Sequence, residues 1–142
     1  MKSAVRTLLA VVAGMAVAFA LVVAVEFFSS IVHPFPAGFD GNIPAHVRRY
    51  PHWVLGVVAL MWGATAAAAI WVASRIGGRL AGALVTLLLA SALAFNLSML
   101  PYVMWFKVAM PAAFFVACLL GTRYGRRTAS PAAVADAALR SR

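Results

Sequence analysis

Four long apolar runs dominate the 142-residue sequence and constrain its fold more than any other feature. They cover residues 8–28, 53–73, 80–99 and 102–121, and each has about the 20 residues that a helix needs to cross a bilayer core. Hydrophobic residues make up 65% of the chain, against roughly 45–50% in soluble domains. We therefore predict an all-α integral membrane protein, a bundle of four transmembrane helices.

The chain outside these runs is too short for a second domain. The longest remaining stretches are an outer loop, 29–52, and a tail, 122–142, whereas a soluble catalytic domain needs at least about 50 residues. We expect one membrane domain over 1–142, with the loop as an external cap. The start of the chain resembles a signal peptide, but its apolar run continues to Phe28, so an uncleaved anchor is expected.

The basic residues predict how the bundle is oriented. If the four helices alternate through the bilayer, nine basic residues fall on one side: Lys2, Arg6, Arg75, Arg79, Arg123, Arg126, Arg127, Arg140 and Arg142. Only Arg48, Arg49 and Lys107 fall on the other side. The positive-inside rule then places both termini in the cytoplasm of a multi-pass protein of the cytoplasmic (inner) membrane. The net charge of +9 is explained by orientation and by attraction to anionic lipid, so no nucleic-acid partner is predicted.

Small residues at spacing four predict where the helices approach one another closely. One such row is Ala10, Gly14 and Ala18; another is Ala109, Ala113, Ala117 and Gly121. The segment 74–79, with sequence SRIGGR, is expected to form a short cytoplasmic turn between antiparallel helices.

Polar side chains gather at the predicted outer end. The candidates for a polar site there are Glu26, His33, Asp40, Asn96 and Lys107. Glu26 either is an interfacial acid that reaches water or pairs with Lys107, or is a desolvated acid that binds a proton or cation. Asn96 either bonds to a neighbouring helix or contacts a ligand. The inner halves of the helices lack ionisable groups, which argues against ion conduction by a monomer.

The outer loop is explained without catalysis. Pro34 and Pro36 favour an extended segment, and Pro44–Tyr50 is expected to form a short interfacial helix. The loop histidines and Asp40 match no compact metal motif, and no haem, nucleotide or Walker pattern occurs, so neither metal nor cofactor is predicted. In the tail, Ser130 is a candidate N-cap for a short helix.

These segments together resemble small four-helix bacterial membrane proteins of unknown function. The residues that carry the resemblance are Glu26, Pro34, Pro36, Asn96, Pro101, Trp105 and Phe106. The group has a histidine before its Trp-Phe pair, and this chain lacks it. The resemblance implies the four-helix fold and its topology but no activity.

No nucleophile and base occur in a recognisable pattern, so the sequence predicts a non-enzymatic protein. The leading hypothesis is an accessory or assembly subunit, with the lipid bilayer and either a membrane protein or a second copy of the chain as partners. The alternative is a proton-coupled transporter or small-molecule binder that uses Glu26 and Asn96.

Overall fold

The computed structural model describes residues 2–126, and within this range all regular secondary structure is helical. The helices are α1 (Lys2–Val32), α2 (Ile43–Val47), α3 (His52–Met99) and α4 (Met104–Arg126). The predicted all-α class is confirmed. The short helix for which Ser130 is the predicted N-cap lies outside the described residues.

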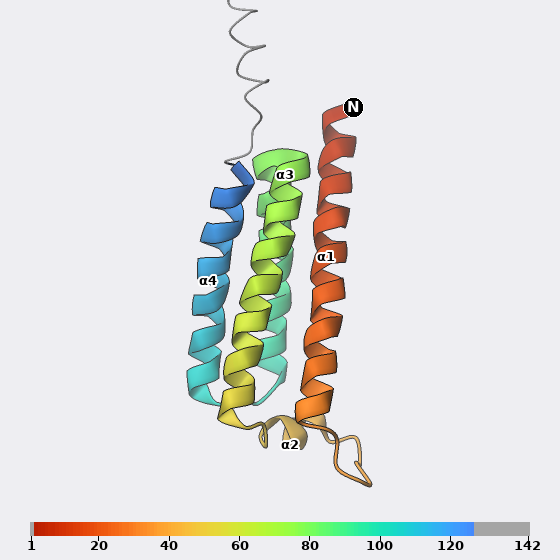
Figure 1. The fold of residues 1–142 in the computed structure, drawn as a ribbon, viewed down its shortest axis with the longest axis vertical. Coiled ribbons are helices and arrows are strands. Elements are labelled where there is room, and N and C mark those ends of the chain that lie inside the picture. Colours follow the sequence, from red (N-terminus) through yellow and green to blue (C-terminus); the bar gives the residue numbers. More distant parts are fainter. Residues whose placement is uncertain (1, 127–142) are drawn as a thin grey trace, which may run out of the picture.

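The long helix α3 folds back on itself at Gly78 (Figure 1). Gly78 has φ 75° and ψ −162°, a backbone conformation that is essentially restricted to glycine. Helical structure otherwise continues through the segment 74–79, which makes the turn tighter than the sequence predicts. Arg6 of α1 supports the turn, because its Nε donates a hydrogen bond to the carbonyl of Ile76. We call residues 52–77 and 79–99 the first and second arms of α3.

The helices α1 and α4 lie on opposite sides of α3 and pack against it (Figure 1). In the part of the chain that the structure describes, they do not pack against each other. The reversal of α3, the N-terminus of α1 and the end of α4 lie at one end of the bundle. Residues 33–51, which include α2, and the turn 100–103 lie at the other end, which we call the cap end.

The core changes in character along the bundle. Near the reversal it consists mostly of alanine, including Ala10, Ala69 and Ala73, so the helix backbones approach closely. Near the cap end the buried side chains are larger: Val25, Val54, Leu55, Leu93, Phe106 and Met110.

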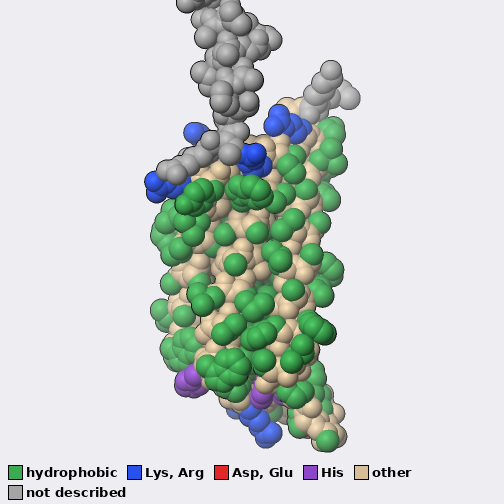
Figure 2. Space-filling view, in the orientation of Figure 1, with side chains coloured by type: hydrophobic (Ala, Val, Ile, Leu, Met, Phe, Trp, Pro, Cys, Tyr) green, Lys and Arg blue, Asp and Glu red, His purple; other side chains and the backbone are tan. Residues whose placement is uncertain are grey.

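The sides of the bundle are apolar and its ends are charged (Figure 2). Large hydrophobic side chains such as Phe19, Leu60 and Phe115 are exposed there. Three helices, α1, α3 and α4, are long and apolar enough to span a membrane. These features indicate a membrane protein, since water-soluble monomers rarely expose apolar surface on this scale.

Candidate functional site

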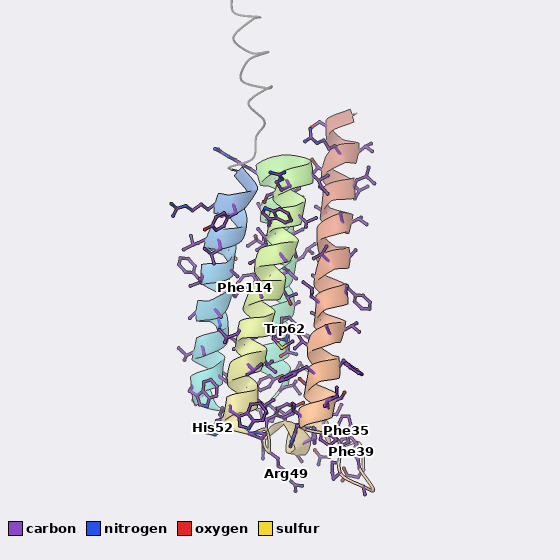
Figure 3. All side chains as sticks on the ribbon, in the orientation of Figure 1. Phe35, Phe39, Arg49, His52, Trp62 and Phe114 are labelled. Atoms are coloured by element: carbon purple, nitrogen blue, oxygen red, sulfur yellow. The ribbon has the colours of Figure 1, made fainter. Side chains whose placement is uncertain are left out.

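A cavity of about 250 Å³ lies at the cap end, where α1, α2, both arms of α3 and α4 meet. Its polar lining consists of Glu26, Ser29, His46, Tyr50, Asn96 and Tyr102. Its apolar lining includes Leu55, Val58, Trp62 and Met110. Trp62 lies well inside the bundle, about 15 Å along the helix from His52 (Figure 3). The cavity therefore combines polar groups near the cap with an apolar floor inside the bundle.

Glu26 lines this cavity from α1, about 9 Å along the helix from its last residue, Val32. Its side chain is exposed. No ion pair forms between any residues in the described range, and Lys107, the partner considered from the sequence, does not line the cavity. Two tyrosines, Tyr50 and Tyr102, are close enough for the Glu26 charge to influence them.

Asn96 reaches the same cavity from the end of the second arm of α3. Its backbone carbonyl accepts a hydrogen bond of 3.2 Å from the Leu100 amide, where the helix ends. Its side chain hydrogen-bonds with Tyr102 in the turn that follows. Asn96 thus has a polar partner six positions along the chain.

Both cavity tyrosines favour the neutral phenol. Burial, together with the negative charge of Glu26, raises the pKa of Tyr102 to about 12. Burial and the same charge also raise the pKa of Tyr50, while its hydrogen bond with Ser29 acts in the opposite direction. Glu26 therefore lies among neutral hydroxyl and amide groups.

An aromatic cluster on the cap closes one side of the cavity. His33 and His46 stack with ring centroids 4.4 Å apart and an interplanar angle of 24°, and Tyr50 lies 4.4 Å from His33. Phe35 and Phe39 extend the cluster over His46 (Figure 3). The buried Nε2 of His33 has no hydrogen-bond partner. His33 thus contributes to the cap and lies beside the cavity without lining it.

The remaining charged candidates point elsewhere. Asp40 accepts a hydrogen bond of 2.9 Å from the Asn42 amide and faces a second concavity, on the cap surface, together with Arg49. Arg49 extends away from the helices in Figure 3, and Arg48 is exposed. Glu26 is consequently the one residue lining the cavity that carries a formal charge at neutral pH.

The residues of the loop and turn motif have different surroundings. Pro34 and Pro36 are exposed on the cap, and the Pro36 carbonyl accepts the Phe39 amide at 3.1 Å. Pro101 lies in the turn before α4. Trp105 is partly exposed, near His52, whereas Phe106 is only 2% exposed and lines the cavity.

Sequence reasoning did not assign several lining residues to a site. Tyr50, Trp53, Tyr102 and Trp105 lie at the outer ends of the apolar runs, where aromatic residues are typical of the membrane interface. The structure separates these pairs: the tyrosines face the cavity, while Trp53 and Trp105 are 61% and 39% exposed. The phenol hydroxyls of Tyr50 and Tyr102, each beside the end of a predicted helix, are the sequence feature that could have identified them as site residues.

A smaller apolar void of about 10 Å³ lies deeper in the bundle, between both arms of α3 and α4. Trp62 and Met110 line both this void and the cavity. Gly63 and Phe114 line the void but not the cavity. The apolar lining therefore continues beyond the cavity floor.

Neither metal ligands nor known relatives assign a role to the cavity. Across residues 2–126, no three His, Cys, Asp or Glu side chains lie close enough to hold a metal ion. No protein-family model, curated protein or solved structure matches the chain significantly. The resemblance to small bacterial membrane proteins therefore stays a prediction.

We expect the cap to lose stability in acid through His46. Burial, followed by the charges of His33 and Arg49, lowers the pKa of His46 below its ordinary value near 6.5. The unfolded chain therefore binds more protons than the folded chain as the pH falls through about 6.5, and stability falls with it. Thermal unfolding followed from neutral to mildly acidic pH should show this loss. The variant His46→Phe, which keeps a ring in the stack, should show a weaker pH dependence.

The matched control is His52→Phe, because His52 is exposed and contacts only Trp105 among the aromatic rings of the described chain. It should keep the pH dependence of the wild type. Equal pH dependence in His46→Phe and the wild type would show that His46 does not titrate with unfolding.

Proposed function

We propose that this chain is an integral membrane protein that crosses the bilayer four times and binds a small amphipathic molecule in the cap-end cavity. The four spans are α1, the two arms of α3, and α4. The length of α3 supports this count, because 48 residues in one straight helix would measure about 72 Å, more than twice the roughly 30 Å bilayer core. The reversal at Gly78 gives two arms of suitable length.

The proposed orientation has both termini in the cytoplasm of a bacterium and the cap on the outer side of its inner membrane. The basic side chains support it. Arg6, Arg75, Arg79 and Arg123 belong to the end opposite the cap, and more basic residues follow in the tail. Cytoplasmic segments of membrane proteins carry such an excess of Lys and Arg. In this orientation the cavity is reached from the outer side of the inner membrane.

The observation that carries the binding role is the cavity, with polar groups near the cap and an apolar floor inside the bundle. Small-molecule sites are mostly apolar concavities with a few polar groups that orient the ligand. Here the apolar body of a ligand would contact Val58, Trp62 and Met110, and its polar group would contact Glu26, Asn96 or a tyrosine hydroxyl.

The accessory or assembly role predicted from the sequence is less well supported by this geometry. An assembly face needs a feature that distinguishes it from surface covered by lipid. The exposed apolar side chains occur on α1, on both arms of α3 and on α4, as lipid contact alone requires. A partner membrane protein or a second copy of the chain therefore becomes the explanation if the cavity binds nothing.

We expect the variant Val58→Phe to abolish binding of small amphipathic probes. Val58 is 9% exposed and lines the cavity, so a larger ring there would occupy ligand space. The probes are benzyltrimethylammonium and neopentylbenzene, which have the same shape but differ in charge. Binding is followed by fluorescence of Trp62 in nanodiscs, with Trp53, Trp71 and Trp105 replaced by phenylalanine, because Trp62 is the one tryptophan that lines the cavity.

The control for this experiment is Val108→Phe, the same replacement at a side chain that is 68% exposed on α4. Saturable binding of either probe that survives Val108→Phe and is lost in Val58→Phe supports the proposal. A fluorescence change that is equal in both variants would reflect partition into lipid, and the proposed function would then fail.

A further inference from the structure

We infer that the cavity selects a monovalent organic cation with an apolar body. This inference rests on the proposed function, because it names the ligand class of the same site. It depends on three observations: the charge of the lining, the chemistry of the cavity walls, and the placement of the nearby basic residues.

The first observation is that Glu26 is a single, unpaired negative charge in the lining. An acid that far inside the end of α1 is costly if it faces lipid, and the polar cavity relieves that cost. The carboxylate has no cationic partner within the described protein, so a bound cation would supply one. An anionic ligand would instead be repelled at this position.

The second observation is that aromatic rings surround the same space. Tyr50, Tyr102 and Phe106 line the cavity beside Glu26, and Trp62 lies at its floor. Ring faces attract cations, and quaternary ammonium groups in particular are bound by such rings. A group with a diffuse charge and an apolar surface suits these walls better than a small, strongly hydrated metal ion.

The third observation is that the basic residues of the cap end stay out of the cavity. Arg48 and Arg49 are exposed on the cap, where salt screens their charge over about 8–10 Å. Lys107 lies in the first turn of α4 and does not line the cavity. The Glu26 carboxylate therefore dominates the local field within the cavity, despite the net positive charge of the chain.

The test compares benzyltrimethylammonium with neopentylbenzene, its neutral isostere, by the Trp62 fluorescence assay. The cation should bind roughly tenfold more tightly to the wild type, as expected for one favourable charge contact of moderate strength. Glu26→Gln keeps the shape of the side chain and should remove this preference, so that the two probes bind to the variant with similar affinity. A cooperative thermal unfolding transition like that of the wild type shows that the variant is folded.

The control is Asp40→Asn, which removes the same charge from the cap end without altering the cavity. It should retain the preference for the cation. Equal binding of both probes to the wild type, or equal loss of the preference in Glu26→Gln and Asp40→Asn, would overturn cation selection while the cavity remained a binding site. If neither probe binds, the proposed function itself is wrong.

Discussion

We expect replacement of Gly78 by alanine to destabilise the protein by about 1–3 kcal/mol and to loosen the reversal of α3. The cause is the backbone, because φ 75° with ψ −162° is a conformation that side chains disfavour. Space is not the problem, since a Cβ at Gly78 would meet nothing within 4 Å. Asparagine should rescue little, because it tolerates the left-handed helical region, whose ψ is about +47°.

The measurement combines thermal unfolding with the distance between spin labels at positions 60 and 95. Leu60 and Phe95 are both exposed and lie on opposite arms of α3. In the folded-back helix the labels should be close, whereas in a continuous helix they would be about 52 Å apart. Gly56→Ala is the control, because Gly56 is helical and has open space around it. This account of the turn would be wrong if the Gly78→Ala variant unfolded at the wild-type temperature and the labels at positions 60 and 95 showed a single short distance.

The sequence predicts the helices well because their signal is local. Each apolar run is long enough to identify its helix, but its ends are less reliable than its centre. The first apolar run covers residues 8–28, whereas α1 extends from Lys2 to Val32. Backbone hydrogen bonding continues past the last apolar residue, so a helix extends beyond the apolar run that predicts it. Similarly, the sequence predicts a turn over 74–79, whereas in the structure only Gly78 has a non-helical backbone conformation in this segment.

The site was harder to predict because its residues come from separate segments. Glu26 and Asn96 stand out in the sequence as polar side chains near the ends of apolar runs. That both line one cavity depends on how α1 packs against the two arms of α3. Tyr50 and Tyr102 belong to loop and turn segments whose folding over the helix ends has no local signal. The sequence therefore indicates candidates, and only the packing decides which of them meet.

Helix packing through small residues leads to the second large effect, which we expect at Gly14. A Cβ at Gly14 would lie 2.9 Å from the carbonyl oxygen of Ala69 and 3.0 Å from the Cβ of Ala73. Neither atom can move without its helix backbone, so Gly14→Ala should force α1 away from α3. Overpacking of this kind costs about 1–3 kcal/mol. Alanine also favours the helix over glycine by about 1 kcal/mol. The measured loss of stability would therefore be smaller than the energetic cost of the clash itself.

Gly56→Ala separates the two contributions, because the helix-forming gain is common to both variants and only Gly14 faces another helix closely. We expect Gly56→Ala to be neutral or slightly stabilising and Gly14→Ala to unfold at clearly lower temperature in the same detergent. Gly14→Leu should be worse still, since even a Cβ at Gly14 would lie 3.2 Å from Cγ2 of Val85 on the second arm, and leucine adds three more carbon atoms. If all three variants unfold like the wild type, α1 does not pack on α3 through Gly14, and the cavity wall that carries Glu26 would have to be placed differently.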